Sequence, residues 1–311
     1  MATQTMNAIQ VHDYGDVNQL KFEQIAKPEP REGEVLVQVY AAGVNPMDWK
    51  FRSGVLKDFV PLTFPYVPGA ELAGVVEKVG PGVTEFKFGQ EIFGRSSSGS
   101  YAEYSIAPVK TLVLKPKTLS FEEAATIPVG ATTAWQGLFD HGNLQSGQLV
   151  LILGGAGGVG LFAVQFARLK GAHVISTTST GNIEFVRSLG AETVIDYTKT
   201  SVEKAIHDVD LVFDTVGGSA LAGVLPALKR GGTLITIAGQ PDEAKARELG
   251  VNFARFSAQT NTELLKTFAQ MIDDGQIKAF VGATFPLSEA SKAQELSQSG
   301  HGRGRIILHI S

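Results

Sequence analysis

The stretch LVLILGGAGGVGLFAVQFARLKGAHVISTTS, residues Leu149 to Ser179, decides the fold of this chain. An apolar run of strand length leads into a series of glycines, and a helical pattern then leads into a second apolar run. The stretch therefore predicts a strand, a glycine turn, a helix and a second strand. The helix is expected to bury one wide apolar face, formed by Val159, Phe162, Ala163, Phe166 and Leu169.

The glycines of this turn follow the pattern G-x-G-x-x-G, at Gly155, Gly157 and Gly160. A strand directly before this pattern and a helix directly after it are typical of a dinucleotide-binding loop. The first glycine makes the turn, the second lets the backbone approach a pyrophosphate, and the third lets the helix pack on the strand. We expect a dinucleotide here, bound also by Gly158 and Val159. A glycine-rich corner without a ligand is the alternative.

The end of the second strand indicates which dinucleotide binds. A site for NAD usually has Asp or Glu at this place, for the ribose 2′-hydroxyl. Here the sequence is VISTTSTGN, which offers hydroxyls instead of a carboxylate. NADPH is therefore the expected cofactor, and NADH is the alternative because the loop also lacks a basic clamp. The expected contacts are Ser176, Ser179, Thr180 and Tyr197, and Arg187 is a further candidate; for Tyr197 and Arg187 a structural role is an equal alternative.

Strand and helix patterns continue to alternate as far as about residue 257. FVRSLG ends a helix, ETVIDY and VDLVFDTVGG are strands, ALAGVLPALKR is a helix and GTLITIAG is a strand. This alternation predicts a parallel sheet with right-handed crossovers. Gly217 and Gly239 end successive strands at the carboxyl edge, where open α/β sheets bind ligands. We expect both to contact the cofactor, although turn glycines would show the same pattern.

The flanking sequence has a different pattern. Residues 1–121 consist mostly of short strands, such as EVLVQVYAAG, LAGVVEKVG and YAEYSIAP, separated by Gly and Pro. Residues after about 258 predict an amphipathic helix and a last strand, RIILHI. We expect an α/β fold in which residues 1–121 and 258–311 form a β-rich domain and residues 122–257 a doubly wound one.

The composition excludes several classes of function. The 311 residues carry 27 basic and 31 acidic side chains without a basic stripe, so nucleic acid is not an expected partner. The chain has no cysteine and its six histidines are dispersed, so no metal site is expected. No tyrosine has a lysine four places on, as a short-chain dehydrogenase would need. The N-terminus has no signal-peptide pattern and the apolar runs are too short for a bilayer, so we expect a cytoplasmic protein without a membrane partner.

Several motifs together resemble one family. In order they are GVNPMDWK, PGAELAGVVEKVG, YAEY, AATIPVGATTAW, GGAGGVG and SGHGRGRIIL. This series resembles the medium-chain dehydrogenase/reductase superfamily, and its zinc-free quinone oxidoreductase and enone reductase branch most. The resemblance implies a GroES-like catalytic domain that holds both termini, a Rossmann domain between, and a homodimer built through the Rossmann sheets. Zinc-bearing relatives have Cys in the first motif and His where this chain has Ala70, so no zinc is expected.

The resemblance also implies residues for the site. Asn45 would approach the nicotinamide ribose or the substrate. Lys50 stands where many quinone reductases have Tyr, and it would bind a carbonyl oxygen or the cofactor unless it is a surface lysine. Asp48 is expected to be structural. Thr133 resembles a cofactor contact, and the pair Phe280 and Val281 resembles the segment beside the nicotinamide.

The chemistry that follows is hydride transfer without a metal. Reduction of a quinone or an α,β-unsaturated carbonyl spreads negative charge into an enolate or phenolate, so a positioned donor and solvent suffice. We expect an NADPH-dependent reductase of such small molecules. A cofactor-binding regulatory or redox-sensing protein without turnover is the alternative, and an alcohol dehydrogenase is a third reading.

Glu71, in the segment VPGAELAG, is a carboxylate among small and apolar residues. A buried carboxylate needs a partner or a raised pKa. The last strand offers Arg305, which belongs to the same domain if the resemblance holds. We predict a partly buried ion pair between Glu71 and Arg305.

Overall fold

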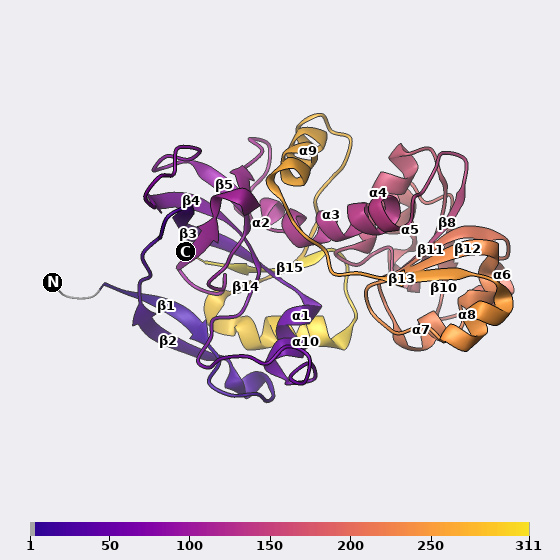
Figure 1. Ribbon diagram of the computed structural model, residues 1–311, viewed down its shortest axis with the longest axis horizontal. Helices are drawn as coiled ribbons and strands as arrows, with labels where there is room; N and C mark the ends of the chain where they lie inside the picture. Colours follow the sequence, from indigo (N-terminus) through magenta and orange to yellow (C-terminus); the bar gives the residue numbers. More distant parts are fainter. Residues whose placement is uncertain (1–3, 311) are drawn as a thin grey trace. The chain divides into compact units, whose positions relative to one another are not determined.

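The computed structural model describes residues 4–310, and the chain divides into two compact units. One combines Met1–Val129, Thr260–Gly275 and Ala279–Ser311, and we call it the split unit. The other holds Gly130–Gln259 and Gln276–Lys278, and we call it the central unit. In Figure 1 the split unit is indigo to magenta and returns in yellow, whereas most of the central unit is pink to orange.

The central unit is built on a six-stranded parallel sheet. The strand order is β10-β9-β8-β11-β12-β13, so the chain starts in the middle and winds outward twice, as in a Rossmann fold. The expected parallel sheet is thereby confirmed. Its strands are β8 (Leu149–Leu153), β9 (His173–Thr178), β10 (Thr193–Asp196), β11 (Val209–Asp214), β12 (Leu228–Thr236) and β13 (Asn252–Arg255).

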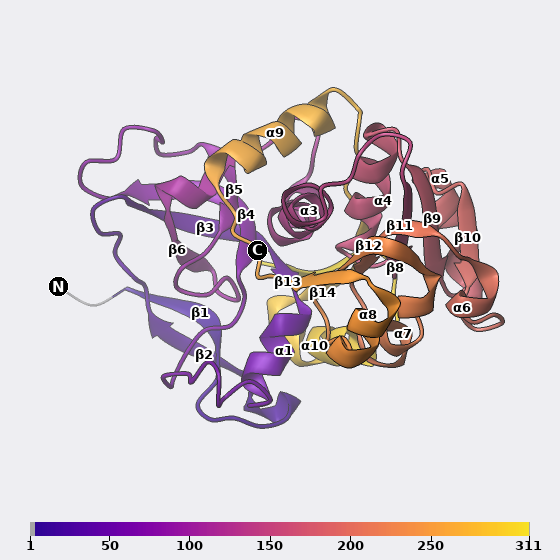
Figure 2. The same cartoon turned by 45° about the vertical axis from the view of Figure 1, so that its right-hand side comes forward.

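Helices cover both faces of this sheet, which explains why the central strand β8 is apolar throughout and almost fully buried. Figures 1 and 2 show α4 and α5 on one face and α7 and α8 on the other. The helices are α4 (Gly160–Leu169), α5 (Ile183–Ser188), α6 (Val202–Ala205), α7 (Gly218–Ala222) and α8 (Glu243–Leu249), and α3 (Ile127–Trp135) continues as a π-helix over Gln136–His141.

Some expectations for this unit were wrong in detail. The helix predicted over ALAGVLPALKR ends at Ala222, because Gly223 and Pro226 cannot continue it, and Leu228 already begins β12. Leu169, expected on the buried face of its helix, is 43% exposed at the helix end. Helix α8 and the short edge strand β13 were not predicted.

The split unit is built around β3 (Glu34–Val44), which pairs with strands from early and late in the sequence. The sheet order is β14-β15-β3-β4-β5-β7, and β6 also pairs with β3. The last strand of the chain therefore lies between β14 and β3. The other strands are β4 (Glu71–Val79), β5 (Glu91–Arg95), β6 (Tyr104–Pro108), β7 (Leu112–Leu114), β14 (Val281–Pro286) and β15 (Arg305–His309), with β1 (Thr5–Gln10) and β2 (Lys21–Ala26) as a separate pair.

Four α-helices accompany this sheet within the described residues: α1 (Pro46–Arg52), α2 (Phe121–Ala124), α9 (Thr262–Asp273) and α10 (Ala290–Ser299). Helix α10 packs on β14, β15 and α1, and its alanines join the core of the unit. Helix α9 buries Leu265, Phe268 and Ile272, as its helical spacing predicts. Helix α10 and strand β14 were not predicted.

Within residues 4–310, no helix has both the length and the apolar character that crossing a bilayer requires.

Candidate functional site

The glycine loop connects β8 to α4 at the middle of the central sheet. A Cβ on Gly155 would overlap the hydroxyl of Ser176, and a Cβ on Gly160 would overlap the carbonyl oxygen of Gly154. These two glycines are therefore required by the close packing of strand, turn and helix.

Gly157 is different, because the protein itself leaves room for a side chain there. An added Cβ would approach only the Gly154 carbonyl oxygen, at 3.4 Å, which is an ordinary contact. Val159 is the N-cap of the helix that follows, α4, and its side chain offers no hydrogen bond to the first N–H groups. A loop with bare backbone, leading into a helix N-terminus, fits the phosphates of a dinucleotide. Gly158 and Val159 belong to the same turn.

The hydroxyls at the end of β9 and in the turn after it have different hydrogen-bond partners. Ser176 is fully buried, and its hydroxyl donates to the carbonyl oxygen of Ile152 at 2.9 Å. Its side chain supports the loop from inside, and contact of Ser176 with the cofactor stays a prediction. The Ser179 hydroxyl accepts from the Asn182 side chain at 3.4 Å, and Thr180 donates to Asp196 at 2.5 Å.

Tyr197 and Arg187, the other two residues considered for this part of the cofactor, differ in how free their side chains are. Tyr197 directly follows β10 and is 51% exposed, so its ring is available. Arg187 lies on α5, where its guanidinium is paired with Glu184 at 2.6 Å.

Gly217 and Gly239 follow β11 and β12 at the carboxyl edge of the sheet. Gly217 has a positive φ of 75°, and its N–H donates to the Asp214 carboxylate at 2.9 Å. The N–H of Gly239 donates to the hydroxyl of Thr236 at 3.3 Å. The buried Asp214 and Thr236 are themselves joined at 2.6 Å, so the two strand ends are held together. Both glycines therefore have turn roles, and contact with a cofactor stays a prediction.

The remaining cofactor candidates come from both units. Thr133 is almost fully buried on α3, within the central unit. Phe280 and Val281 belong to the split unit, where Val281 opens β14 and the carbonyl oxygen of Phe280 accepts from the N–H of Arg305 at 3.1 Å.

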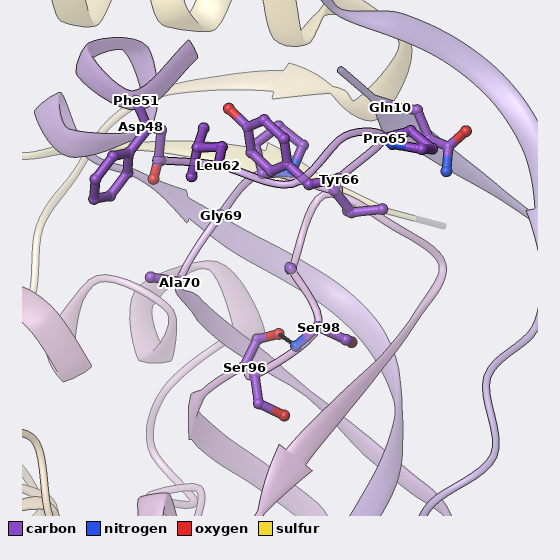
Figure 3. A pocket seen from close by; sticks show the side chains of 14 residues that line it. Gln10, Asp48, Phe51, Leu62, Pro65, Tyr66, Gly69, Ala70, Ser96 and Ser98 are labelled. Atoms are coloured by element: carbon purple, nitrogen blue, oxygen red, sulfur yellow. Dashed lines mark hydrogen bonds between the residues drawn. The ribbon is translucent and has the colours of Figure 1, made fainter. Parts of the chain in front are cut away.

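The split unit contains a cavity of about 520 Å³. Figure 3 shows Phe51, Leu62 and Tyr66 along one side of it, and Ser96 and Ser98 along the other. Ala70, where the family resemblance implies a histidine ligand in zinc-bearing relatives, also lines it. The cavity therefore combines apolar and aromatic walls with a few hydroxyls.

Asp48 lines the same cavity from the first turn of α1 and is buried. Its Oδ2 accepts from the backbone N–H of Asn45 at 2.8 Å and from the hydroxyl of Tyr101 at 2.8 Å. Burial raises the pKa of Asp48 to about 6, and the negative charge of Glu71 acts in the same direction. The two hydrogen bonds and the charge of Arg305 oppose the rise in this pKa without cancelling it. Asp48 is therefore a helix-capping residue, as expected, and also a carboxyl that titrates near neutral pH.

This raised pKa predicts a pH-dependent contribution to stability. Free aspartate has a pKa of about 4, so folding strengthens proton binding at Asp48. The stabilising contribution is full below about pH 4 and is lost as the pH rises through about 6, a change of roughly 3 kcal/mol. Urea unfolding at pH 4, 5.5 and 7 measures this change. Between pH 4 and pH 7 the free energy of unfolding of wild type is expected to fall by this amount relative to that of Asp48→Asn. The exposed Asp58→Asn is the control, and a pH-independent difference between wild type and Asp48→Asn would contradict the assignment.

Glu71, on β4, is fully buried and contacts three other segments. Its Oε1 accepts from the side-chain amide of Asn45 at 2.9 Å and lies 3.1 Å from Nε of Arg305. Its Oε2 accepts from the N–H of Val129, in the first turn of α3, at 2.8 Å. Gly43, opposite Glu71 on β3, makes room for the carboxylate, because a Cβ there would overlap it.

The predicted Glu71–Arg305 pair is confirmed, but its burial is complete rather than partial. The side chains are 0% and 5% exposed. Nε and Nη2 of Arg305 have no hydrogen bond of good geometry, so the contact is ionic rather than an aligned hydrogen bond. The contribution of this pair to stability therefore depends largely on the attraction between the two charges.

Asn45 and Lys50, the two residues expected to be catalytic, differ in whether their side chains are already bonded within the protein. Asn45 precedes α1, is buried, and has its amide committed to Glu71. Lys50 is half-buried on α1, with Nζ 5.6 Å from the centre of the Trp49 ring. Their contact with substrate or cofactor stays a prediction.

Metal-ligating side chains do not gather in the part of the chain that the structure describes: residues 4–310 contain no group of three or more His, Cys, Asp or Glu that could hold an ion.

Three features of the site were missed by sequence reasoning. They are the bond between Asp48 and Tyr101, the bond between Thr180 and Asp196, and the room that Gly43 makes. An isolated glycine inside the strand pattern EVLVQVYAAGV marks a close approach, so Gly43 could have been found. The other two join residues that lie far apart in the sequence, 53 positions for Asp48 and Tyr101 and 16 for Thr180 and Asp196, and have no local signal.

The sheet order and the β-rich unit define an α/β protein with a Rossmann sheet and a GroES-like domain. Residues 31–117 match the family described as the alcohol dehydrogenase GroES-like domain, and residues 189–308 match zinc-binding dehydrogenase. The chain is 36% identical to 2-methylene-furan-3-one reductase of Solanum lycopersicum, over 98% of this chain and 79% of that protein. It has the same identity and coverage with the chloroplastic NADPH-dependent alkenal/one oxidoreductase of Arabidopsis thaliana.

Among solved structures, the quinone oxidoreductase from Coxiella burnetii superposes with a TM-score of 0.90 at 32% identity, covering 99% of this chain and 100% of that one. The chain belongs to the medium-chain dehydrogenase/reductase superfamily, in the branch of the quinone oxidoreductases and enone reductases. It is therefore an enzyme of the oxidoreductase class.

Proposed function

We propose that this enzyme is a zinc-independent, NADPH-dependent reductase that transfers hydride to quinones or α,β-unsaturated carbonyls. The observation that carries the proposal is the glycine loop, in which Gly157 leaves bare backbone at the start of α4 although the protein has room for a side chain. The names of the relatives support the substrate class, since they include an alkenal/one oxidoreductase and quinone oxidoreductases.

When bound, NADPH supplies the hydride, and the protein supplies binding and orientation. The N-terminus of α4 and the glycine loop would hold the pyrophosphate. Ser179, Thr180 and Tyr197 would contact the adenosine end. The turns at Gly217 and Gly239 would contact the cofactor at the carboxyl edge of the sheet. Thr133 of the central unit and Phe280 and Val281 of the split unit are further proposed cofactor contacts.

The substrate occupies the cavity of the split unit in this proposal. Its apolar walls suit a ring or alkene. Lys50 would donate toward the carbonyl oxygen, where negative charge would develop during reduction. Asn45 would take part only through the second N–H of its amide, because the first is bonded to Glu71. Solvent delivers the final proton.

Zinc independence is supported by the donor set. Zinc in such enzymes is held by Cys, His and carboxylate ligands. This chain has no cysteine, and Ala70 lines the cavity at the position of a histidine ligand. Elemental analysis of purified protein tests this point, and stoichiometric zinc together with alcohol oxidation would favour an alcohol dehydrogenase.

The proposed activity is tested by NADPH oxidation with a panel of quinones, alkenals and enones. Turnover with at least one class is the expected result, together with no reduction of NADP+ by simple saturated alcohols. Protein that binds NADPH but turns over no member of the panel contradicts the proposal and favours a regulatory or redox-sensing role.

Lys50→Ala is expected to lower kcat for the best substrate by about 100-fold, because it removes a donor to the developing oxyanion. NADPH affinity should change little. Lys57→Ala, an exposed lysine of the same unit, is the matched control. Equal rates in wild type and Lys50→Ala would remove Lys50 from the mechanism.

We further propose a domain division into residues 1–121 with 258–311 and residues 122–257, a cytoplasmic location, and a homodimer formed through the Rossmann sheets. Strand β13 supports the dimer, because it is the last strand of its sheet in the described residues and offers an unpaired edge. A mass of a single chain in light scattering would contradict the dimer.

A further inference from the structure

A polar cluster joins the carboxyl ends of β9 and β10. The carboxylate of Asp196 accepts from the hydroxyl of Thr180 at 2.5 Å and from the hydroxyl of Thr198 at 2.6 Å. It also accepts from the N–H of Thr198 at 3.0 Å, and Nζ of Lys199 lies 3.4 Å away. Asp196 thus gathers the polar groups of two neighbouring strand ends around one negative charge.

This cluster lies where a Rossmann fold reads the 2′-position of the ribose. Strands β9 and β10 are parallel, and Thr178 pairs with Asp196 at their ends. In NAD sites the acid that reads the ribose comes from the end of the second strand. That strand is β9 here and ends without one, but the neighbouring strand β10 ends in Asp196. The loop after β9 contains no carboxylate in its own sequence, but the fold places the carboxylate of Asp196 beside it.

The cluster changes what the loop can offer to a phosphate. Hydrogen bonds from Thr180 and Thr198 lower the pKa of Asp196 to about 2, so its carboxylate is ionised at neutral pH. The single hydroxyl proton of Thr180 is used in this bond, so Thr180 cannot donate it to a 2′-phosphate. Lys199 offsets the charge only in part, because its side chain is 65% exposed and screened by solvent.

We propose that Asp196 limits the preference for NADPH, so that the enzyme also accepts NADH. The proposal rests on the proposed function, since it concerns how that cofactor is chosen. A 2′-phosphate carries a charge of about −1.5 to −2 and is repelled by the nearby carboxylate, whereas a 2′-hydroxyl is neutral. Asp196 would then be a specificity-determining residue that acts by charge.

The experiment is a fluorescence titration of NADPH and NADH with wild type, Asp196→Asn and Asp210→Asn. Asp210 is a matched control, because it lies at the opposite, amino edge of the same sheet, where it accepts from Leu149 N–H and pairs with Lys229. In Asp196→Asn the Kd for NADPH should fall about five- to tenfold and the Kd for NADH should change less than about twofold. The gain should shrink in high salt. Asp210→Asn should leave the ratio of the two Kd values unchanged.

A second variant tests the placement without disturbing the cluster. A Cβ on Gly181 would meet no atom within 4 Å. Gly181→Lys adds a positive charge in the same loop and should likewise strengthen NADPH relative to NADH. The proposal is overturned if either variant leaves the ratio of the two Kd values unchanged, or if Asp196→Asn weakens both cofactors equally, as a purely structural role would. Wild type that binds neither cofactor would overturn the proposed function, and this inference with it.

Discussion

Gly157→Ala is expected to weaken NADPH binding by about 100-fold, or about 2.7 kcal/mol, while the free energy of unfolding stays within about 0.5 kcal/mol of wild type. The variant should affect cofactor binding but not stability, because of how the loop is packed. The protein leaves room for a Cβ at Gly157, so folding is undisturbed. The pyrophosphate of a bound dinucleotide would approach this backbone closely, so the same methyl group would displace it. Titration with NADPH and urea unfolding measure the two quantities.

Gly160→Ala is the matched comparison. Its Cβ would overlap the carbonyl oxygen of Gly154, so the helix would have to move away from the strand. This variant should lose about 1–3 kcal/mol of stability, as overpacked sites do. If Gly157→Ala bound NADPH as tightly as wild type, the loop would not be a phosphate site, and the proposed function would lose its main support.

Arg305→Met is expected to reduce the free energy of unfolding by about 3–5 kcal/mol, which is the cost of leaving a buried charge without its partner. The carboxylate of Glu71 would keep its hydrogen bonds from Asn45 and Val129 but lose its only cation within 4 Å in the described residues. Urea unfolding at pH 7 measures the loss. Because the charge of Arg305 also opposes the raised pKa of Asp48, this pKa should rise further in the variant.

The double variant Glu71→Met with Arg305→Met separates charge from packing. Replacing both partners of a buried pair by apolar residues usually costs much less than removing one. The double variant should therefore be more stable than Arg305→Met alone. A loss below about 1 kcal/mol in Arg305→Met would show that the ionic contact contributes little.

The central unit could be predicted from the sequence because its signals are local. The run LVLIL, the glycine turn and the helix of Phe162 and Phe166 are adjacent in the chain, and each agrees with the next. Strand β13 was missed because four residues at a sheet edge, none of them fully buried, have no clear alternation. Helix α8 had signals that could have been used, an N-capping Asp242 and a left-handed Gly250 at its end.

The site could be predicted only in part, because much of it joins distant segments. The pair of Glu71 and Arg305 was predicted from the resemblance of this chain to a known family, and no pattern within the chain indicates it. The bond from Tyr101 to Asp48 spans 53 positions and has no periodic signal. Asp196 could have been considered, since parallel strands bring their carboxyl ends to one edge, but only the register of β9 and β10 places it beside Thr180.

The position of β15 has a consequence for how the chain is made. All six strands of the central sheet lie in one continuous segment, from Leu149 to Arg255, which a ribosome delivers without interruption. The sheet of the split unit, by contrast, lacks an inner strand until Arg305–His309 has been synthesised. Arg305 follows Glu71 by roughly 230 residues, on the order of ten to fifty seconds of translation. During that interval the edge of β3 that β15 will cover stays open to pairing with other chains, so the nascent chain is exposed to aggregation until β15 has been synthesised.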